Sequence, residues 1–135
     1  MNCESINIEI SSNPKFVSIV RLTASGIANK MGFSIEDIDD IKVSLSEACT
    51  NVIKHTKAEK MTISFNLFED RLEILVNDNG KGYDYKTLEK PRVNNLKESG
   101  MGIFIIESLM DEVFINSNDN QGTTINMIKY LGVGV

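Results

Sequence analysis

The chain has 135 residues, which suffice for one domain with a single core and are too few for two. Its hydrophobic content of 41 % and charged content of 24 % are typical of a soluble globular domain, and a net charge of −5 without a basic stripe argues against nonspecific nucleic-acid binding. No apolar run approaches the roughly 20 residues that span a bilayer, and the N-terminus lacks the layout of a signal peptide, so we expect a cytoplasmic protein without a membrane partner.

The first half of the chain predicts one strand followed by two helices. Isoleucines alternate with polar residues over 6–10, which indicates a half-buried strand. Asn13-Pro14 is typical of a helix start, and Gly32 ends the helical period that follows. Ser34 begins a second helix that runs to about His55. The apolar stripe of this second helix consists of Ile38, Ile41, Leu45, Ala48 and Val52.

The second half predicts two hairpins separated by a long loop and a helix. Alternating apolar residues over 63–67 and 72–76 indicate the first hairpin. The polar stretch 83–99 has no clear period, and loops of that length are usually functional or disordered. A helix follows over 100–110, and the chain closes with a hairpin whose last strand covers 122–131.

This order of elements indicates the α+β class. We expect a two-layer α/β sandwich, with the helices on one face of a mixed, largely antiparallel sheet. We expect the whole of 1–135 to form one domain.

One face of the second helix carries polar residues that its packing does not need. Glu47, Asn51, Lys54 and His55 fall at i, i+4, i+7 and i+8, so they share a face beside the apolar stripe. An acid and an amide there would point into the edge of a cavity. The same pattern taken alone is typical of a solvated helix face.

Asp78 continues the inward phase of the strand at 72–76. A carboxylate on the inner side of a sheet is costly unless a donor reaches it, and the amino group of adenine is a suitable donor. The alternative is that the strand ends at Val76 or Asn77, and that Asp78 opens a turn, because Asp-Asn-Gly is a strong turn sequence.

Two glycine pairs add to this pattern. They occur in Gly80-Lys81-Gly82 and in Gly100-Met101-Gly102, the latter at a helix start. Glycine lets the backbone approach a ring or phosphate closely, and helix N-termini offer free N–H groups to anions. Neither a Walker A loop nor a Rossmann fingerprint is present.

The combination of these motifs is more specific than its parts. Glu47–Asn51, Asp78–Gly82, Gly100–Gly102 and Gly122-Thr123-Thr124 resemble, in order and spacing, the N, G1, G2 and terminal motifs of the GHKL ATPase superfamily, which contains gyrase B, MutL and the histidine kinases. The resemblance covers nearly the whole chain and implies a Bergerat-type ATPase fold.

Other segments resemble the bacterial anti-sigma-factor serine kinases more narrowly. These segments are Ile19–Thr23, Val43–Asn51, Phe68–Glu73, Leu109–Val113 and Lys129–Leu131. The stress-response anti-sigma-B type resembles the chain most, with the sporulation anti-sigma-F type close behind. The segment between the two glycine motifs is shorter than in many stress-response members, which leaves the bound sigma factor open.

The resemblance assigns roles to the polar residues. It implies that Asn51 binds Mg²⁺ through its side-chain oxygen and that Glu47 is the general base for the attacking hydroxyl. It implies that Asp78 accepts the adenine amino proton with support from Thr124, and that residues 83–99 form an ATP lid.

The remaining assignments form two groups. The residues that would shape the ATP pocket are Gly80, Gly82, Gly100, Met101 and Gly102, of which Met101 is given no role of its own. Lys54, His55 and Lys81 are possible phosphate contacts that are as easily explained by solvent exposure, and Arg21 resembles a partner-contacting arginine.

These roles predict an ATP- and Mg²⁺-dependent serine/threonine protein kinase. The resemblance implies that it sequesters an alternative sigma factor, phosphorylates the anti-anti-sigma antagonist and forms a homodimer. One alternative is a catalytically inactive ATP-binding module that only sequesters the sigma factor, although a pure binder has no need of Glu47. Another is a histidine-kinase-type ATPase module, although such a kinase needs an acceptor histidine in a separate helical domain and this chain has only His55.

Overall fold

A computed structural model describes residues 3–78, 101–118 and 122–132. Its elements are β1 (Glu4–Ser11), a short 3-10 helix η1 (Pro14–Phe16), α1 (Val17–Met31), α2 (Ile35–His55), β2 (Lys60–Leu67), β3 (Arg71–Asn77), β4 (Glu112–Asn118) and β5 (Gly122–Tyr130). A further helix covers residues 101–109, between β3 and β4.

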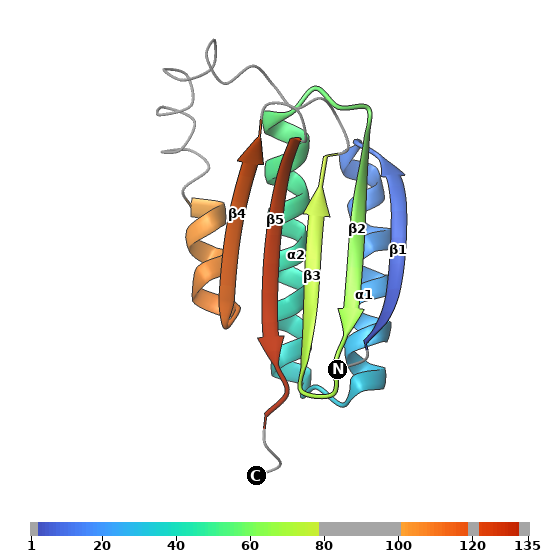
Figure 1. The fold of residues 1–135 in the computed structure, drawn as a ribbon, viewed down its shortest axis with the longest axis vertical. Coiled ribbons are helices and arrows are strands. Elements are labelled where there is room, and N and C mark those ends of the chain that lie inside the picture. The colour runs from blue at the N-terminus through green and yellow to red at the C-terminus, as the bar shows by residue number, and fades with distance from the viewer. Residues whose placement is uncertain (1–2, 79–100, 119–121, 133–135) are drawn as a thin grey trace.

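The five strands form one sheet in the order β1-β2-β3-β5-β4 (Figure 1). Each of its four neighbouring pairs is antiparallel. The expected sheet was mixed, but the strands that the structure describes include no parallel pair. The antiparallel pairing of β3 with β5 fixes the register that sets Asn77 opposite Thr124 and Val76 opposite Ile125.

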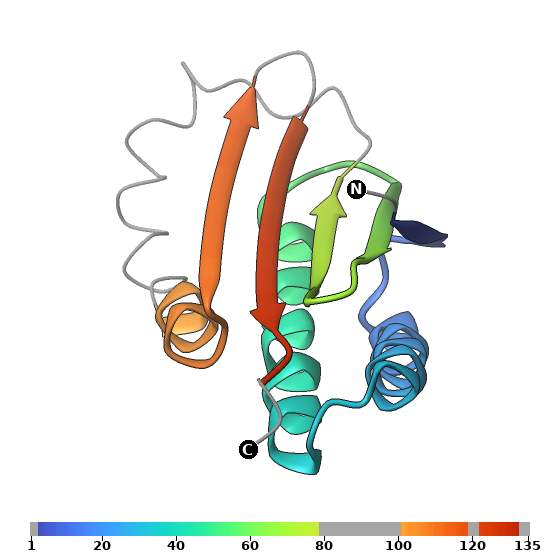
Figure 2. The same cartoon turned by 60° about the horizontal axis from the view of Figure 1, so that its bottom comes forward.

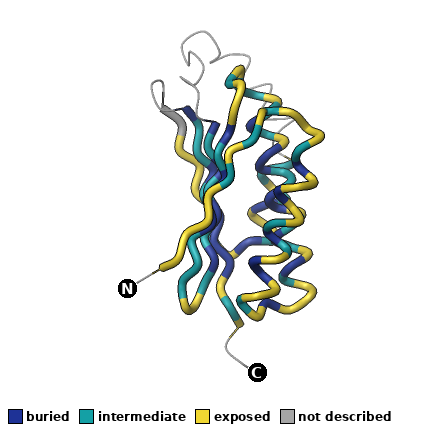
Figure 3. The backbone as a smooth tube through the Cα atoms, turned by 90° about the vertical axis from the view of Figure 1, so that its right-hand side faces the viewer, coloured by how far each residue is buried: buried dark blue, intermediate teal, exposed yellow. Residues whose placement is uncertain are grey.

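The helices cover one face of this sheet, as the α+β prediction requires. Seen along the sheet edge, the strands form one layer and the helices a second (Figure 3). In Figure 2, α1 lies at the β1 side, α2 lies behind the centre, and the helix at 101–109 lies beside β4. Buried apolar side chains fill the space between the layers, and burial of this surface is the main stabilising contribution to such a fold.

The helix boundaries follow the predicted capping residues. The Asn13 side chain accepts a hydrogen bond from the Lys15 amide at 3.0 Å, and the Ser34 hydroxyl accepts one from the Asp37 amide at 3.1 Å. Gly32 ends α1 in the left-handed conformation with a φ of 97°. Each cap satisfies a backbone group that the helix leaves unpaired, which is why local sequence located these ends.

Burial along the strands separates the two faces of the sheet. The inward side chains of β2 and β3 are fully buried, and they are Met61, Ile63, Phe65, Leu72, Ile74 and Val76. Asp78 and Lys129 are the two charged side chains that are buried within the described parts of the chain. Buried charges require partners, so these two positions identify where the fold departs from a plain apolar core.

The helices have the dimensions of packed core elements. Within the described residues, no helix is both long and apolar enough to cross a membrane.

Candidate functional site

The two polar residues predicted on α2 converge on a glycine of another helix. Glu47 and Asn51 are half-buried on α2, one turn apart. A methyl group in place of the Gly102 hydrogen would lie 3.0 Å from Asn51 Nδ2 and 3.3 Å from Glu47 Oε1. The absence of a side chain at Gly102 therefore lets the two helices approach at these polar groups.

Gly102 stands in the first described turn of the helix at residues 101–109. The first N–H groups of a helix lack intrahelical acceptors and favour anions. Placed beside a carboxylate and an amide, this helix end offers backbone donors next to a potential base and a potential metal ligand. Met101, at the same end, is 67 % exposed.

Asp78 lies immediately after β3 and is fully buried, in phase with the inward residues of that strand. Its Oδ2 atom accepts a hydrogen bond from the Thr123 amide at 3.1 Å, and its own amide donates to the Thr123 carbonyl at 3.2 Å. The inward position agrees with the prediction that Asp78 continues the phase of the strand, while β3 itself ends at Asn77, as the alternative had it; residues 79–82, where a turn would lie, are outside the described residues. The backbone donor explains how the fold tolerates a buried carboxylate at this point.

Gly122, at the start of β5, is packed against the same carboxylate. Its φ is 79°, and a methyl group at its Cα would lie 1.9 Å from Asp78 Oδ1. A residue with a side chain would meet both backbone strain and a steric overlap there. The glycine of the Gly-Thr-Thr motif is therefore required by the position of Asp78.

Thr124 lies opposite Asn77 in the pairing of β5 with β3. Its hydroxyl accepts a hydrogen bond from Asn77 Nδ2 at 2.7 Å. Successive strand residues point to opposite faces, so Thr124 and Asp78 lie on opposite faces. The threonine whose backbone the structure joins to Asp78 is Thr123, and the support of Thr124 for an adenine contact stays a prediction.

The other residues of α2 near this arrangement in sequence differ in exposure and orientation. Lys54 is exposed, and His55 is half-buried with contacts of its own. Cys49 lies between Glu47 and Asn51 in sequence but faces the core, and burial raises the pKa of its thiol to about 12. At neutral pH this thiol is protonated and is a poor nucleophile.

Several predicted site residues lie outside the described part of the chain. They are Gly80, Lys81, Gly82, Gly100 and the lid at 83–99. Arg21 is described and is exposed on α1.

The donor set suits a cation that is shared with phosphates. The described residues contain no cluster of three His, Cys, Asp or Glu side chains suited to holding a metal ion. Mg²⁺ needs few protein ligands, prefers oxygen and completes its shell with water and phosphate oxygens. Asn51 packs with its Nδ2 atom toward Gly102, and the oxygen of the same amide group is the kind of ligand that meets this requirement.

These elements gather at one end of the molecule. The end of β3, the start of β5 and the C-terminal part of α2 all lie toward the same end in Figure 1. A carboxylate within the sheet layer thus accompanies an acid and an amide within the helix layer. An antiparallel sheet with helices on one face agrees with the predicted ATPase class of domain, and comparison with known proteins shows that class.

The sequence matches the family of the Histidine kinase-like ATPase domain over residues 10–129. The serine-protein kinase RsbW of Bacillus cereus strain ATCC 10987 is 42 % identical over 95 % of this chain and 86 % of the relative. RsbW of Bacillus velezensis strain FZB42 is 40 % identical over 93 % of this chain and 85 % of the relative. The chain therefore belongs to the histidine kinase-like ATPases and, among them, to the RsbW serine-protein kinases.

A solved structure supports the fold. The crystal structure of the RsbU and RsbW domains of a Mycobacterium tuberculosis protein matches with a TM-score of 0.72 at 20 % sequence identity. The match covers 95 % of this chain and 32 % of that chain.

Proposed function

We propose that this chain is an ATP-dependent kinase that transfers the γ-phosphoryl group of ATP to a serine of a partner protein. One observation carries the proposal: Glu47 and Asn51 meet the first turn of a helix at Gly102, where a methyl group would lie within 3.3 Å of both side chains. Phosphoryl transfer needs positioning and charge neutralisation, and a carboxylate, an amide and a helix N-terminus supply both. The kinship with RsbW kinases favours this activity over a histidine-kinase module.

In the proposed reaction, each residue has a separate task. Asp78 accepts a hydrogen bond from the adenine amino group, and Asn51 supplies an oxygen ligand to Mg²⁺. Mg²⁺, when bound, neutralises charge on the phosphate oxygens. Glu47 takes the proton of the attacking serine hydroxyl while the new O–P bond forms. The bond between the γ-phosphorus and the bridging oxygen breaks, and ADP leaves.

The partners of the proposed kinase come from its family. We infer that it holds an alternative sigma factor and phosphorylates the antagonist that releases this factor, in the cytoplasm and as a homodimer. We take the chain to be a single kinase domain, with 83–99 as its ATP lid. Arg21, exposed on α1, is a candidate contact for a partner.

The transfer can be tested directly. The protein is incubated with Mg²⁺, with ATP labelled at its γ-phosphate and with a candidate antagonist protein. We expect label on a serine of the antagonist, and no label when Mg²⁺ is chelated. Nucleotide binding without transfer to any antagonist would instead favour a module that only sequesters its partner.

A second measurement tests the base contact. We expect Asp78→Asn to weaken ATP binding about tenfold or more, which is typical for the loss of a hydrogen bond to a charged group. We expect GTP binding to change less, because guanine lacks the amino group at that position. An unchanged preference for ATP over GTP would remove Asp78 from the proposed contact.

A further inference from the structure

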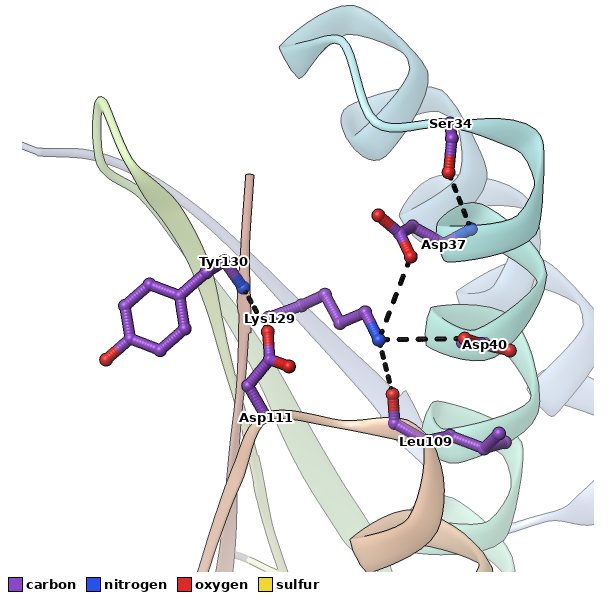
Figure 4. Close-up of polar contacts among 7 residues, drawn as sticks. All are labelled: Ser34, Asp37, Asp40, Leu109, Asp111, Lys129 and Tyr130. Carbon is purple, nitrogen blue, oxygen red and sulfur yellow. Dashed lines mark hydrogen bonds and ion pairs between the residues drawn. The ribbon is translucent and has the colours of Figure 1, made fainter. Parts of the chain in front are cut away.

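Lys129 is a buried cation that the proposed reaction does not use. It lies on the inner face of β5, in phase with Ile125 and Met127, and is 8 % exposed. Its Nζ atom donates to the Leu109 carbonyl at 2.5 Å. Figure 4 shows this side chain reaching from β5 to the end of one helix and to the side of another.

The lysine also meets two acidic groups on α2. Its Nζ atom lies 3.6 Å from Asp40 Oδ2 and 3.8 Å from Asp37 Oδ1. An ammonium group has three donors, and these three oxygens match them. The Leu109 carbonyl belongs to the last turn of its helix, where carbonyls lack intrahelical donors and a positive charge is favourable. One side chain therefore joins β5, α2 and the helix at 101–109.

These contacts hold the far end of the helix that carries Gly102. In Figure 1 this helix runs antiparallel to α2. Residues 102 and 109 are about 10 Å apart along their helix, and residues 40 and 47 are about 10 Å apart along α2, at 1.5 Å per residue. The two contacts between these helices are therefore separated by the same distance along each helix. At one end Gly102 meets Glu47, and at the other Lys129 bridges Leu109 to Asp40.

We propose that Lys129 is a positioning residue, which sets where the first turn of the 101–109 helix lies relative to Glu47 and Asn51. This inference rests on the proposed ATP site and adds a determinant of its geometry. A helix held at one end only can tilt or slide, and a small displacement of Gly102 would change the space at the phosphate-binding end. The lysine acts through the helix and touches no substrate.

The decisive variant is Lys129→Met, which keeps most of the side-chain volume and removes the charge. Removing one partner of a buried ion pair usually lowers stability, but here the two aspartates are 32 % and 35 % exposed, so water can hydrate them once the lysine charge is gone. We expect the variant to fold, with a thermal midpoint near that of the unmodified chain. We expect its dissociation constant for ATP with Mg²⁺ to rise by up to about tenfold, because the coupling to the ATP site cannot exceed the free energy of the contact that is lost.

Two controls separate positioning from general stability. Ile63→Val trims a fully buried residue of β2, far along the sheet from this cluster, and should lower stability without weakening ATP binding. Lys129→Arg keeps the charge and a donor for Leu109, so its ATP affinity should lie between those of Lys129→Met and the unmodified chain. Asp40→Asn should give a smaller loss in the same direction, and it decides the question if Lys129→Met does not fold.

Amide hydrogen exchange supplies a readout that needs no nucleotide. In Lys129→Met we expect faster exchange over 101–109 relative to β2 and β3, whereas Ile63→Val should not show this local change. Unchanged exchange over 101–109 together with unchanged ATP affinity in Lys129→Met, or in Asp40→Asn as its substitute, would overturn the role. If the unmodified chain binds no ATP, the proposed function fails, while exchange still decides whether Lys129 holds the helix.

Discussion

The two ends of the candidate site are built by different kinds of structure. At the sheet end, Asp78 is fully buried and bonds to Thr123 through both its backbone and its side chain. At the helix end, Glu47 and Asn51 are half-buried and project toward Gly102 of a second helix. Strand pairing fixes one end, and side-chain packing between two helices fixes the other.

This difference teaches where the site is rigid and where it can adjust. Backbone hydrogen bonds in a sheet resist small displacements, so the sheet end suits recognition of a flat base. Packed helices can shift by fractions of an ångström at modest cost, so the helix end suits groups that must follow a reacting phosphate. Substitutions at the sheet end should therefore mainly lower stability, whereas those at the helix end should mainly weaken ATP binding or phosphoryl transfer. The following predictions run from the largest expected effect to the smallest.

Glu47→Gln should have the largest effect and should act on transfer alone. The amide cannot accept the serine proton, and loss of a general base typically lowers the rate by about 10² to 10⁴. ATP binding should stay near its original value, because the glutamine keeps the shape of the side chain. Rates of label transfer and equilibrium ATP titrations measure the two quantities. Glu69→Gln, on the exposed turn between β2 and β3, is the matched control. Equal losses of binding and transfer would argue against the role of a base.

Gly122→Ala should mainly lower the free energy of unfolding, through the sheet end of the site, rather than the rate of phosphoryl transfer. A methyl group 1.9 Å from Asp78 Oδ1, at a φ of 79°, forces the hairpin or the carboxylate to move. We expect a loss of about 2–4 kcal/mol in the free energy of unfolding, from backbone strain and overpacking together. Denaturant unfolding measures it. A loss below about 0.5 kcal/mol, the usual range for surface substitutions, would show that this end adjusts as readily as the other.

Gly102→Ala should leave the fold intact and weaken nucleotide binding. Alanine favours a helix, and the new methyl group would need Asn51 and Glu47 to move by only a few tenths of an ångström. We expect a rise of about tenfold in the dissociation constant for ATP, about 1.4 kcal/mol. Thermal unfolding should show equal or greater stability. Loss of stability without loss of affinity would reverse the contrast between the two ends.

Gly26→Ala is the matched glycine control and should have the smallest effect. Gly26 is exposed in the middle of α1, and a methyl group there meets nothing within 4 Å. We expect a gain of about 0.5–1 kcal/mol in the free energy of unfolding, because alanine loses less conformational freedom in a helix. ATP affinity should not change. The same denaturant and ATP titrations apply.

The sequence was sufficient for features that depend on neighbouring residues. Helix ends follow from Asn13, Gly32 and Ser34, because a cap is a contact within one turn. The inward position of Asp78 follows from the period of two along β3. The convergence of Glu47 with the glycine at 102 came from resemblance to a family, since residues so far apart in sequence have no local signal.

The features that sequence reasoning missed depend on contacts between distant strands and helices. Two consecutive threonines follow Gly122, and only the register of β5 against β3 selects Thr123 as the partner of Asp78. The alternation of Ile125 and Met127 placed Thr123 on the inner face and was the one available signal. Lys129 continues that alternation, but its acceptors come from two separate helices. The all-antiparallel sheet likewise required the spatial order of the strands.

The close packing of Gly122 against Asp78 couples two positions that are distant in the chain. Since a methyl group at residue 122 would occupy the volume of the carboxylate, residue 122 cannot gain a side chain unless Asp78 moves. A smaller residue at position 78 would remove the steric overlap, but the φ of 79° would still favour glycine at residue 122. Across related kinases, residue 122 should therefore remain glycine even where residue 78 differs.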